Sequence, residues 1–226
     1  MVVQHNLTAM NSNRQLGITT GIQAKSTEKL SSGYKINRAA DDAAGLSISE
    51  KMRRQIRGLT QASLNAQDGI SCVQTAEGAL AEVHDMLQRM NELAVKAGTD
   101  TLQSMDRSYI QSEIDALISE IDRVACATTF NEQSLLNGKF TGKLLQVGAD
   151  TVTGNQIAIS IGSMNAKGLG VSGLKVTGDD GAKGRSAVST IKAALQKVSY
   201  LLSKVLAFRQ RSTCSSSISS LSKISK

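Results

Sequence analysis

Apolar residues recur along the middle of the chain at a spacing typical of a coiled coil. Between Ile48 and Ala97 they make 14 steps over 49 residues, an average of 3.5 residues per step. A sustained repeat of this length predicts an α-helix that supercoils with partner helices. The positions are Ile48, Met52, Ile56, Leu59, Ala62, Ala66, Ile70, Val73, Ala76, Leu80, Val83, Leu87, Met90, Ala94 and Ala97. We expect one long helix from Asp42 to Ala97, which cannot bury this stripe alone.

A second stretch with the same spacing follows a short connection. The apolar positions of residues 110–124 are separated by four, three, four and three residues. Because the connection from Gly98 to Ser104 is short, we expect this helix to fold back antiparallel on the first. The residues expected to form the coiled-coil packing are Ile56, Leu59, Ile70, Val73, Leu80, Val83, Leu87, Met90, Ile110, Ile114, Leu117 and Ile121.

The period changes further along the chain. Alternating apolar residues predict a β-hairpin between residues 143 and 161, and six glycines in residues 166–184 predict a loop. A helical stripe returns over residues 186–202. The predicted fold class is therefore mainly α, a long antiparallel coiled-coil helical rod with a small β-hairpin.

These patterns divide the chain into five segments. They are an N-terminal helix with its link (1–41), the coiled-coil rod (42–142), the hairpin with the glycine-rich loop (143–184), the start of a returning helix (185–202) and a serine-rich basic tail (203–226). Gly33 is the expected stop of the first helix, and Asp41-Asp42 are the expected cap of the second.

Composition agrees with long helices and disfavours a large compact core. The chain has no proline, no tryptophan, three tyrosines and three phenylalanines. Helices are not interrupted by proline, and few aromatic side chains are available to fill a core. No apolar run reaches the length of a membrane span, and the N-terminus lacks the apolar segment of a cleavable signal peptide.

Charge is unevenly distributed. Residues 151–226 carry eleven basic and only two acidic side chains, whereas residues 1–100 are almost neutral. Four basic residues cluster at 51–57, but acidic residues flank them and no aromatic side chains are interleaved. We therefore expect neither a nucleic acid nor a membrane as a partner.

The residues that could carry chemistry do not form a site. They are Cys72, Cys126, Cys214, His5, His84 and the GxGxxG pattern of Gly168, Gly170 and Gly173. The cysteines are far apart and odd in number, which fits neither a disulfide framework nor a zinc site. The glycine pattern is not followed by a helical pattern, as a pyrophosphate site requires. We expect no catalytic residue, metal or cofactor, and hence no enzyme.

The residues themselves resemble bacterial flagellin. The segment 30–46 reads LSSGYKINRAADDAAGL and is similar to the N-terminal signature of that family. Five further blocks follow in order: LTQAS at 59–63, NAQDGIS at 65–71, QTAEGAL at 74–80, LQRMNELAV at 87–95 and EIDRV at 120–124. Because several independent blocks keep their order from about residue 4 to residue 170, the resemblance is specific.

The resemblance implies a structural subunit of the flagellar filament, in a minimal form without outer variable domains. It implies residues 4–32 in the innermost helical layer, export through the flagellar type III apparatus and an extracellular location. The implied partners are other flagellin subunits, a flagellar export chaperone, the filament cap and Toll-like receptor 5. The positions that match the family's receptor-binding residues are Arg89, Leu93 and Glu113. Leu93 falls outside the apolar stripe, so we expect it to be exposed.

The likeness weakens towards the end of the chain. We expect it to fail after Tyr200, because residues 203–226 hold nine serines, five basic residues and no acidic one. That composition suggests a truncated or frame-shifted C-terminus without the final core helix, and hence a subunit defective in assembly. The alternative is a secreted, non-polymerising flagellin-like protein that acts mainly as a ligand of Toll-like receptor 5.

Overall fold

A computed structural model describes residues 6–178 and 180–224 of the chain. It divides into two compact units, one ending at Gln55 and one beginning at Ile56. The long helix α2 (Ala43–Ala97) contributes residues to both. Among the described residues, no helix combines the length and the hydropathy that a bilayer crossing needs.

The first unit begins with α1 (Leu7–Ser32). The side chain of Asn6 caps its start by accepting a hydrogen bond from the Ala9 N–H at 3.2 Å. Gly33 ends it in the left-handed conformation (φ +71°), as predicted. None of the described residues of α1 is buried. Its exposed apolar side chains are Leu7, Met10, Leu16, Ile18, Ile22 and Leu30.

The link to α2 is held by local polar contacts. Asn37 donates from Nδ2 to the Glu28 carbonyl at 3.3 Å, and Arg38 pairs with the Glu28 carboxylate at 3.0 Å. Asp42 then accepts a hydrogen bond from the Gly45 N–H at 2.9 Å, which is the contact of a helix N-cap. The predicted acidic start of the long helix is thus confirmed.

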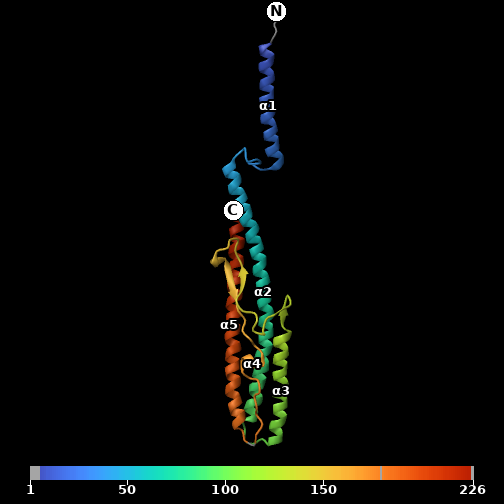
Figure 1. Cartoon of the computed structure of the whole chain (residues 1–226), viewed down its shortest axis with the longest axis vertical. Helices are drawn as coiled ribbons and strands as arrows, with labels where there is room; N and C mark the ends of the chain where they lie inside the picture. Colours follow the sequence, from blue (N-terminus) through green and yellow to red (C-terminus); the bar gives the residue numbers. More distant parts are fainter. Residues whose placement is uncertain (1–5, 179, 225–226) are drawn as a thin grey trace, which may run out of the picture. The chain divides into compact units, whose positions relative to one another are not determined.

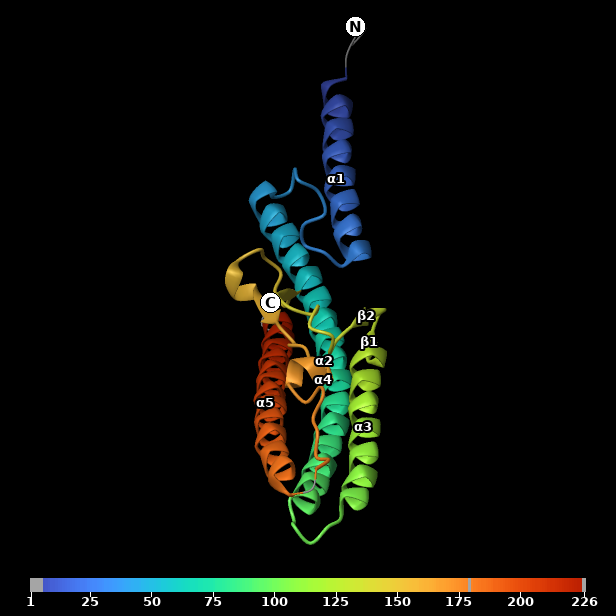
Figure 2. The same ribbon diagram turned by 60° about the horizontal axis from the view of Figure 1, so that its bottom comes forward.

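In the second unit, α2 lies between α3 (Ser104–Ala127) and α5 (Ala182–Ile224), and the three helices run side by side (Figures 1 and 2). The turn after Ala97 reverses the chain, so that α3 is antiparallel to α2, as predicted. Gln103 and Asp106 form a capping box at the start of α3. The core between these helices consists mainly of Leu, Ile, Val and Ala side chains.

Two small antiparallel sheets connect α3 with α5. Strands β3 (Lys143–Gln146) and β4 (Gln156–Ile159) form the predicted hairpin, with a short 3-10 turn, η1 (Thr153–Asn155), before β4. Strands β1 (Thr129–Phe130) and β2 (Gln133–Ser134) form a second hairpin that the sequence pattern did not predict. Its two-residue turn places Asn131 and Glu132 at φ +48° and +62°. Such a turn usually contains glycine. Because this turn has none, the sequence pattern did not indicate a hairpin.

The hairpin β3–β4 approaches α2 closely at glycines of that helix. A Cβ added to Gly58 would lie 2.8 Å from the Cβ of Ala149, and one added to Gly69 would collide with Leu145. Residues 166–178 then run along α3 mostly as loop, as predicted, apart from the single turn α4 (Ala166–Leu169), with contacts to Asp122, Gln111 and Arg107 in turn.

The last helix corrects a prediction. We expected the returning helix to end near residue 202, but α5 continues to Ile224. From Ala187 to Ser212 its buried positions are separated by four and three residues in strict alternation: Ala187, Ile191, Ala194, Val198, Leu201, Val205, Phe208 and Ser212. The repeat does not stop at residue 202, and the serine at 212 only replaces an apolar side chain within it. Residues 203–212 therefore help to cover the stripe of α2.

Candidate functional site

The residues predicted for coiled-coil packing line the inner faces of α2 and α3. Eight of the twelve are buried: Val73, Leu80, Val83, Leu87, Met90, Ile110, Ile114 and Ile121. The other four are half-buried: Ile56, Leu59, Ile70 and Leu117. In the middle of α2 the buried positions next to Ile70 are instead Gly69 and Cys72, where the hairpin packs against the helix.

Of the three residues at positions that match the family's receptor-binding residues, two meet on the outer surface of α2 and α3. Arg89 donates from Nε and Nη2 to Oε1 of Glu113 at 2.9 and 2.8 Å, and from Nη1 to Glu92 at 3.1 Å. The hydrogen bond to Glu113, followed by that to Glu92, raises the pKa of Arg89 above its usual value. Because both side chains of the Arg89–Glu113 pair are about half exposed, the pair adds little stability and stays accessible to a partner.

The third receptor position is not where we expected it. Leu93 is only 4% exposed and belongs to the hydrophobic core, so the prediction of an exposed leucine was wrong. It lies four residues after Arg89 on α2, and the buried face of this helix is here wider than the 3.5-residue stripe.

The described residues contain no cluster of three or more histidine, cysteine or acidic side chains able to hold a metal ion. Cys72 is buried, and its desolvation raises the pKa of the thiol, while Cys126 and Cys214 are exposed. His84 lies with Nε2 2.9 Å from the Gln88 amide. His5 lies outside the described residues.

The glycine pattern forms a connection and not a phosphate loop. Gly168 lies in the one-turn helix α4, Gly170 caps its end at φ +85°, and Gly173 has φ +76° in the loop that follows. No helix of the described chain begins directly after them until α5 at Ala182.

A buried arginine that the sequence pattern did not reveal fastens the end of the rod. Arg107 is fully buried and donates hydrogen bonds to three carbonyl oxygens: Ala97 at 3.2 Å, Thr99 at 2.9 Å and Gly178 at 3.1 Å. It thereby caps the C-terminal end of α2 and holds the glycine-rich loop beside it. Its position, three residues before Ile110 in the helical repeat, was the only available signal.

Comparisons with known proteins agree with this architecture. The bacterial flagellin N-terminal helical region matches residues 3–141. A flagellin of Halalkalibacterium halodurans is 46% identical over 199 residues, covering 88% of this chain and 72% of its own length. The flagellar filament 31.3 kDa core protein of Treponema maltophilum is 42% identical over 228 residues, covering 93% of this chain and 78% of its own.

The second comparison also corrects the expected end of the likeness. A match to 93% of the chain leaves about 16 of the 226 residues outside it. Since 26 residues follow Tyr200, the similarity extends beyond that residue and into the second half of α5.

Solved structures share the fold. A crystal structure of Bacillus cereus flagellin superimposes with a TM-score of 0.60 at 23% identity, covering 69% of this chain and 88% of its own. The structure of a putative flagellar hook-associated protein from Vibrio parahaemolyticus gives a TM-score of 0.67 at 14% identity, covering 83% and 96%. From the family match and the relatives above 40% identity, the chain belongs to the flagellins, which are structural filament proteins and not enzymes.

Proposed function

We propose that this chain is exported through the flagellar type III apparatus, with an export chaperone, and polymerises beneath the filament cap into the extracellular filament. The observation that carries the proposal is α1, whose apolar side chains are all exposed in the described chain. A helix of 26 residues gains most of its stability from burial of such side chains. Assembly with other subunits would provide that burial.

The second unit supports the same role. Within it the apolar stripe of α2 is largely covered, with α5 packed along it as far as Ser212, whereas Ile48 and Met52 of the same stripe are exposed. Residues 203–212 thus cover part of the stripe, contrary to the expectation of a tail that cannot pack, but the assembly defect itself stays a prediction. The requirement to cover α1 remains.

The test is polymerisation of the purified 226-residue chain, followed by electron microscopy after salting-out. We expect regular filaments from the parent and none from the double substitution Ile18→Asp with Ile22→Asp, which places charges on the apolar positions of α1. The matched control is Thr19→Asp with Gln23→Asp, which adds equal charge at polar positions of the same helix. If the parent remains monomeric, the chain is defective in assembly and the proposal is wrong.

A second candidate function is binding to Toll-like receptor 5. It is favoured by the accessible Arg89–Glu113 pair at two positions that match the family's receptor-binding residues. Leu93 would contribute only by supporting α2 from within the core. Receptor signalling should fall after Arg89→Ala with Glu113→Ala, and should persist after Arg123→Ala with Glu120→Ala, a comparable surface ion pair on α3. Equal signalling by both folded variants would exclude the assignment.

A further inference from the structure

The helix α5 carries positive charge and no negative charge. It contains eight basic residues and no aspartate or glutamate. Four of the basic residues are separated by 14, 7 and 7 positions, so they share one position of the seven-residue repeat and follow one edge of the helix. We refer to these four as the basic stripe: Lys183, Lys197, Lys204 and Arg211. All four are exposed.

No carboxylate of the described chain neutralises the basic stripe by an ion pair. Lys197 donates to the carbonyl oxygens of Gly168 and Leu169 at 3.3 and 3.0 Å, and Lys204 lies 4.7 Å from the centre of the Tyr200 ring. By contrast, the arginines of α5 outside the stripe are paired, Arg185 with Asp100 and Arg209 with Glu77. The stripe therefore keeps its positive charge at the surface.

An acidic surface lies on the other two helices. On α2, Glu82, Asp85 and Glu92 share the flank of Arg89, because they lie seven and four residues before it and three after it. This flank adjoins α3, where Arg89 meets Glu113, and Glu120 lies seven residues further along. We call these five carboxylates the acidic flank: Glu82, Asp85, Glu92, Glu113 and Glu120. Arg89, Arg123 and the exposed Lys96, seven residues after Arg89, offset part of its charge, but no ion pair among the described residues involves Glu82 or Asp85.

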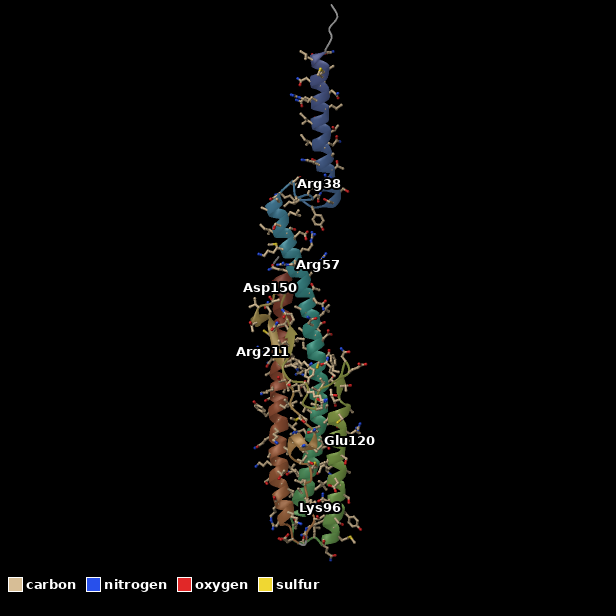
Figure 3. The ribbon with its side chains drawn as sticks, viewed as in Figure 1. Arg38, Arg57, Lys96, Glu120, Asp150 and Arg211 are labelled. Atoms are coloured by element: carbon tan, nitrogen blue, oxygen red, sulfur yellow. The ribbon has the colours of Figure 1, made fainter. Side chains whose placement is uncertain are left out.

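The two surfaces match in spacing and lie on different helices of the second unit. Both repeat every seven residues, which corresponds to about 10.5 Å along a helix. Figure 3 shows Arg211 on α5 and Glu120 on α3, with α2 between these helices, and Figures 1 and 2 agree on that order. Because the surfaces lie on different helices, one copy can use its basic stripe while its acidic flank remains free for the next copy.

We propose that the basic stripe of α5 in one subunit docks on the acidic flank of α2 and α3 in a second copy of the chain. This inference rests on the proposed function and names the surfaces through which the subunits meet. A contact between two different surfaces relates each subunit to the next by the same rotation and translation. When these operations do not close a ring, the contact generates an open helical assembly. Complementary charge selects this pairing, because pairing of like surfaces would bring charges of one sign together.

Charge reversal tests the proposal in the full chain, with assembly followed by sedimentation and electron microscopy. We expect Lys204→Glu with Arg211→Glu to raise the concentration needed for assembly about tenfold or more, and Glu82→Lys with Asp85→Lys to do the same. Combining all four substitutions in one chain should restore assembly, because the reversed surfaces match again. The control Lys175→Glu with Lys192→Glu makes the same change in net charge at exposed positions outside the stripe.

The outcomes separate the two proposals. If the parent chain assembles but the variant with all four substitutions does not, the proposed docking surfaces are wrong and the filament role stands. The same holds if the control variant loses as much assembly as the Lys204→Glu, Arg211→Glu variant. A parent chain that does not associate overturns both. Circular dichroism of each variant should show unchanged helix content, since all the substituted residues are exposed.

Discussion

Arg209 on α5 and Glu77 on α2 form an ion pair, with Nη1 2.8 Å from Oε2. The pair joins α5 to α2 through two residues that are 132 positions apart in the sequence. The Glu77 side chain is 23% exposed and that of Arg209 is 39% exposed, so the contact is better shielded than the other ion pairs of the described chain. It fixes α5 along α2 in the part of the helix that sequence reasoning regarded as a tail.

We predict that this pair contributes measurably to stability. A double-mutant cycle with Arg209→Ala and Glu77→Ala should give a coupling free energy of about 1 kcal/mol, measured by urea unfolding. The surface pair of Arg123 and Glu120 provides the comparison and should give a smaller coupling. A coupling near zero for Arg209 and Glu77 would show that the end of α5 does not hold this position in solution.

Ser212 gives a second test of the same region. It is fully buried at a heptad position, and its hydroxyl has no hydrogen-bond partner among the described residues. Ser212→Ala should therefore stabilise the chain by about 1 kcal/mol, because it removes a buried unpaired hydroxyl and improves helix propensity. Ser199→Ala, at an exposed position of α5, isolates the propensity gain. Destabilisation by Ser212→Ala, measured by thermal unfolding, would contradict the buried environment.

The same serine explains where sequence reasoning was sufficient and where it was not. The rod and its antiparallel partner were predictable, since apolar residues, large ones or alanine, occupy the repeat positions of α2 and α3. In α5 the repeat continues through Val205 and Phe208, but Ser212 interrupts its apolar character and the serine-rich composition concealed it. A coiled-coil helix tolerates a polar residue at one core position when the neighbouring core positions are buried. The amino-acid composition of the segment does not reveal that the repeat continues.

The candidate site shows a similar limit. The helical spacing placed Arg89 and Leu93 on one face, but it could not reveal that Leu93 is buried in the core while Arg89 stays accessible. Exposure depends on how closely the second helix packs, which is a tertiary property. The buried Arg107 was equally hidden, because its partners are backbone carbonyl groups that leave no signal in the sequence.

Leu93 should act as a core residue. We predict that Leu93→Ala lowers the free energy of unfolding by about 2–5 kcal/mol, the usual range for a buried leucine. Leu64→Ala, at a position of α2 that is 49% exposed, should have a much smaller effect. Urea denaturation of both variants decides the matter. If the Leu93→Ala chain is as stable as the parent, Leu93 is exposed in solution and is again a candidate for receptor contact.

Asp100 makes stability depend on pH. Its carboxylate accepts a hydrogen bond from the Gly181 N–H at 2.6 Å and lies 3.3 Å from Arg185. These contacts, the Gly181 hydrogen bond first, lower the pKa of Asp100 below its ordinary value of 3.8. A lowered pKa in the folded state means that the stabilisation is complete above pH 3.8 and is lost as the pH falls through the folded value.

The measurement is unfolding of the parent and of Asp100→Asn across this range. The parent should be the more stable at pH 7, and the difference should shrink below pH 3.8. Asp180→Asn, a change of equal charge at a nearby exposed position, should show a weaker dependence. A difference that is constant from pH 7 to pH 2 would mean that the carboxylate does not favour its charged form.

Arg107 provides the most demanding prediction, because a buried guanidinium is stable only while its donors are occupied. Its three hydrogen bonds go to carbonyl groups in the end of α2, the turn after it and the glycine-rich loop. Arg107→Met keeps most of the apolar volume but leaves these carbonyl groups without their donor, which should cost about 2–4 kcal/mol. Arg107→Lys should recover only part of this loss, since an ammonium group cannot reach three diverging acceptors as a planar guanidinium does. Amide hydrogen exchange should become faster at residues 98–103 and 174–178, while protection of the α2–α5 contact around Arg209 stays as in the parent. Uniformly faster exchange along all three helices would instead show that Arg107 supports the whole core and does not fasten one end of it.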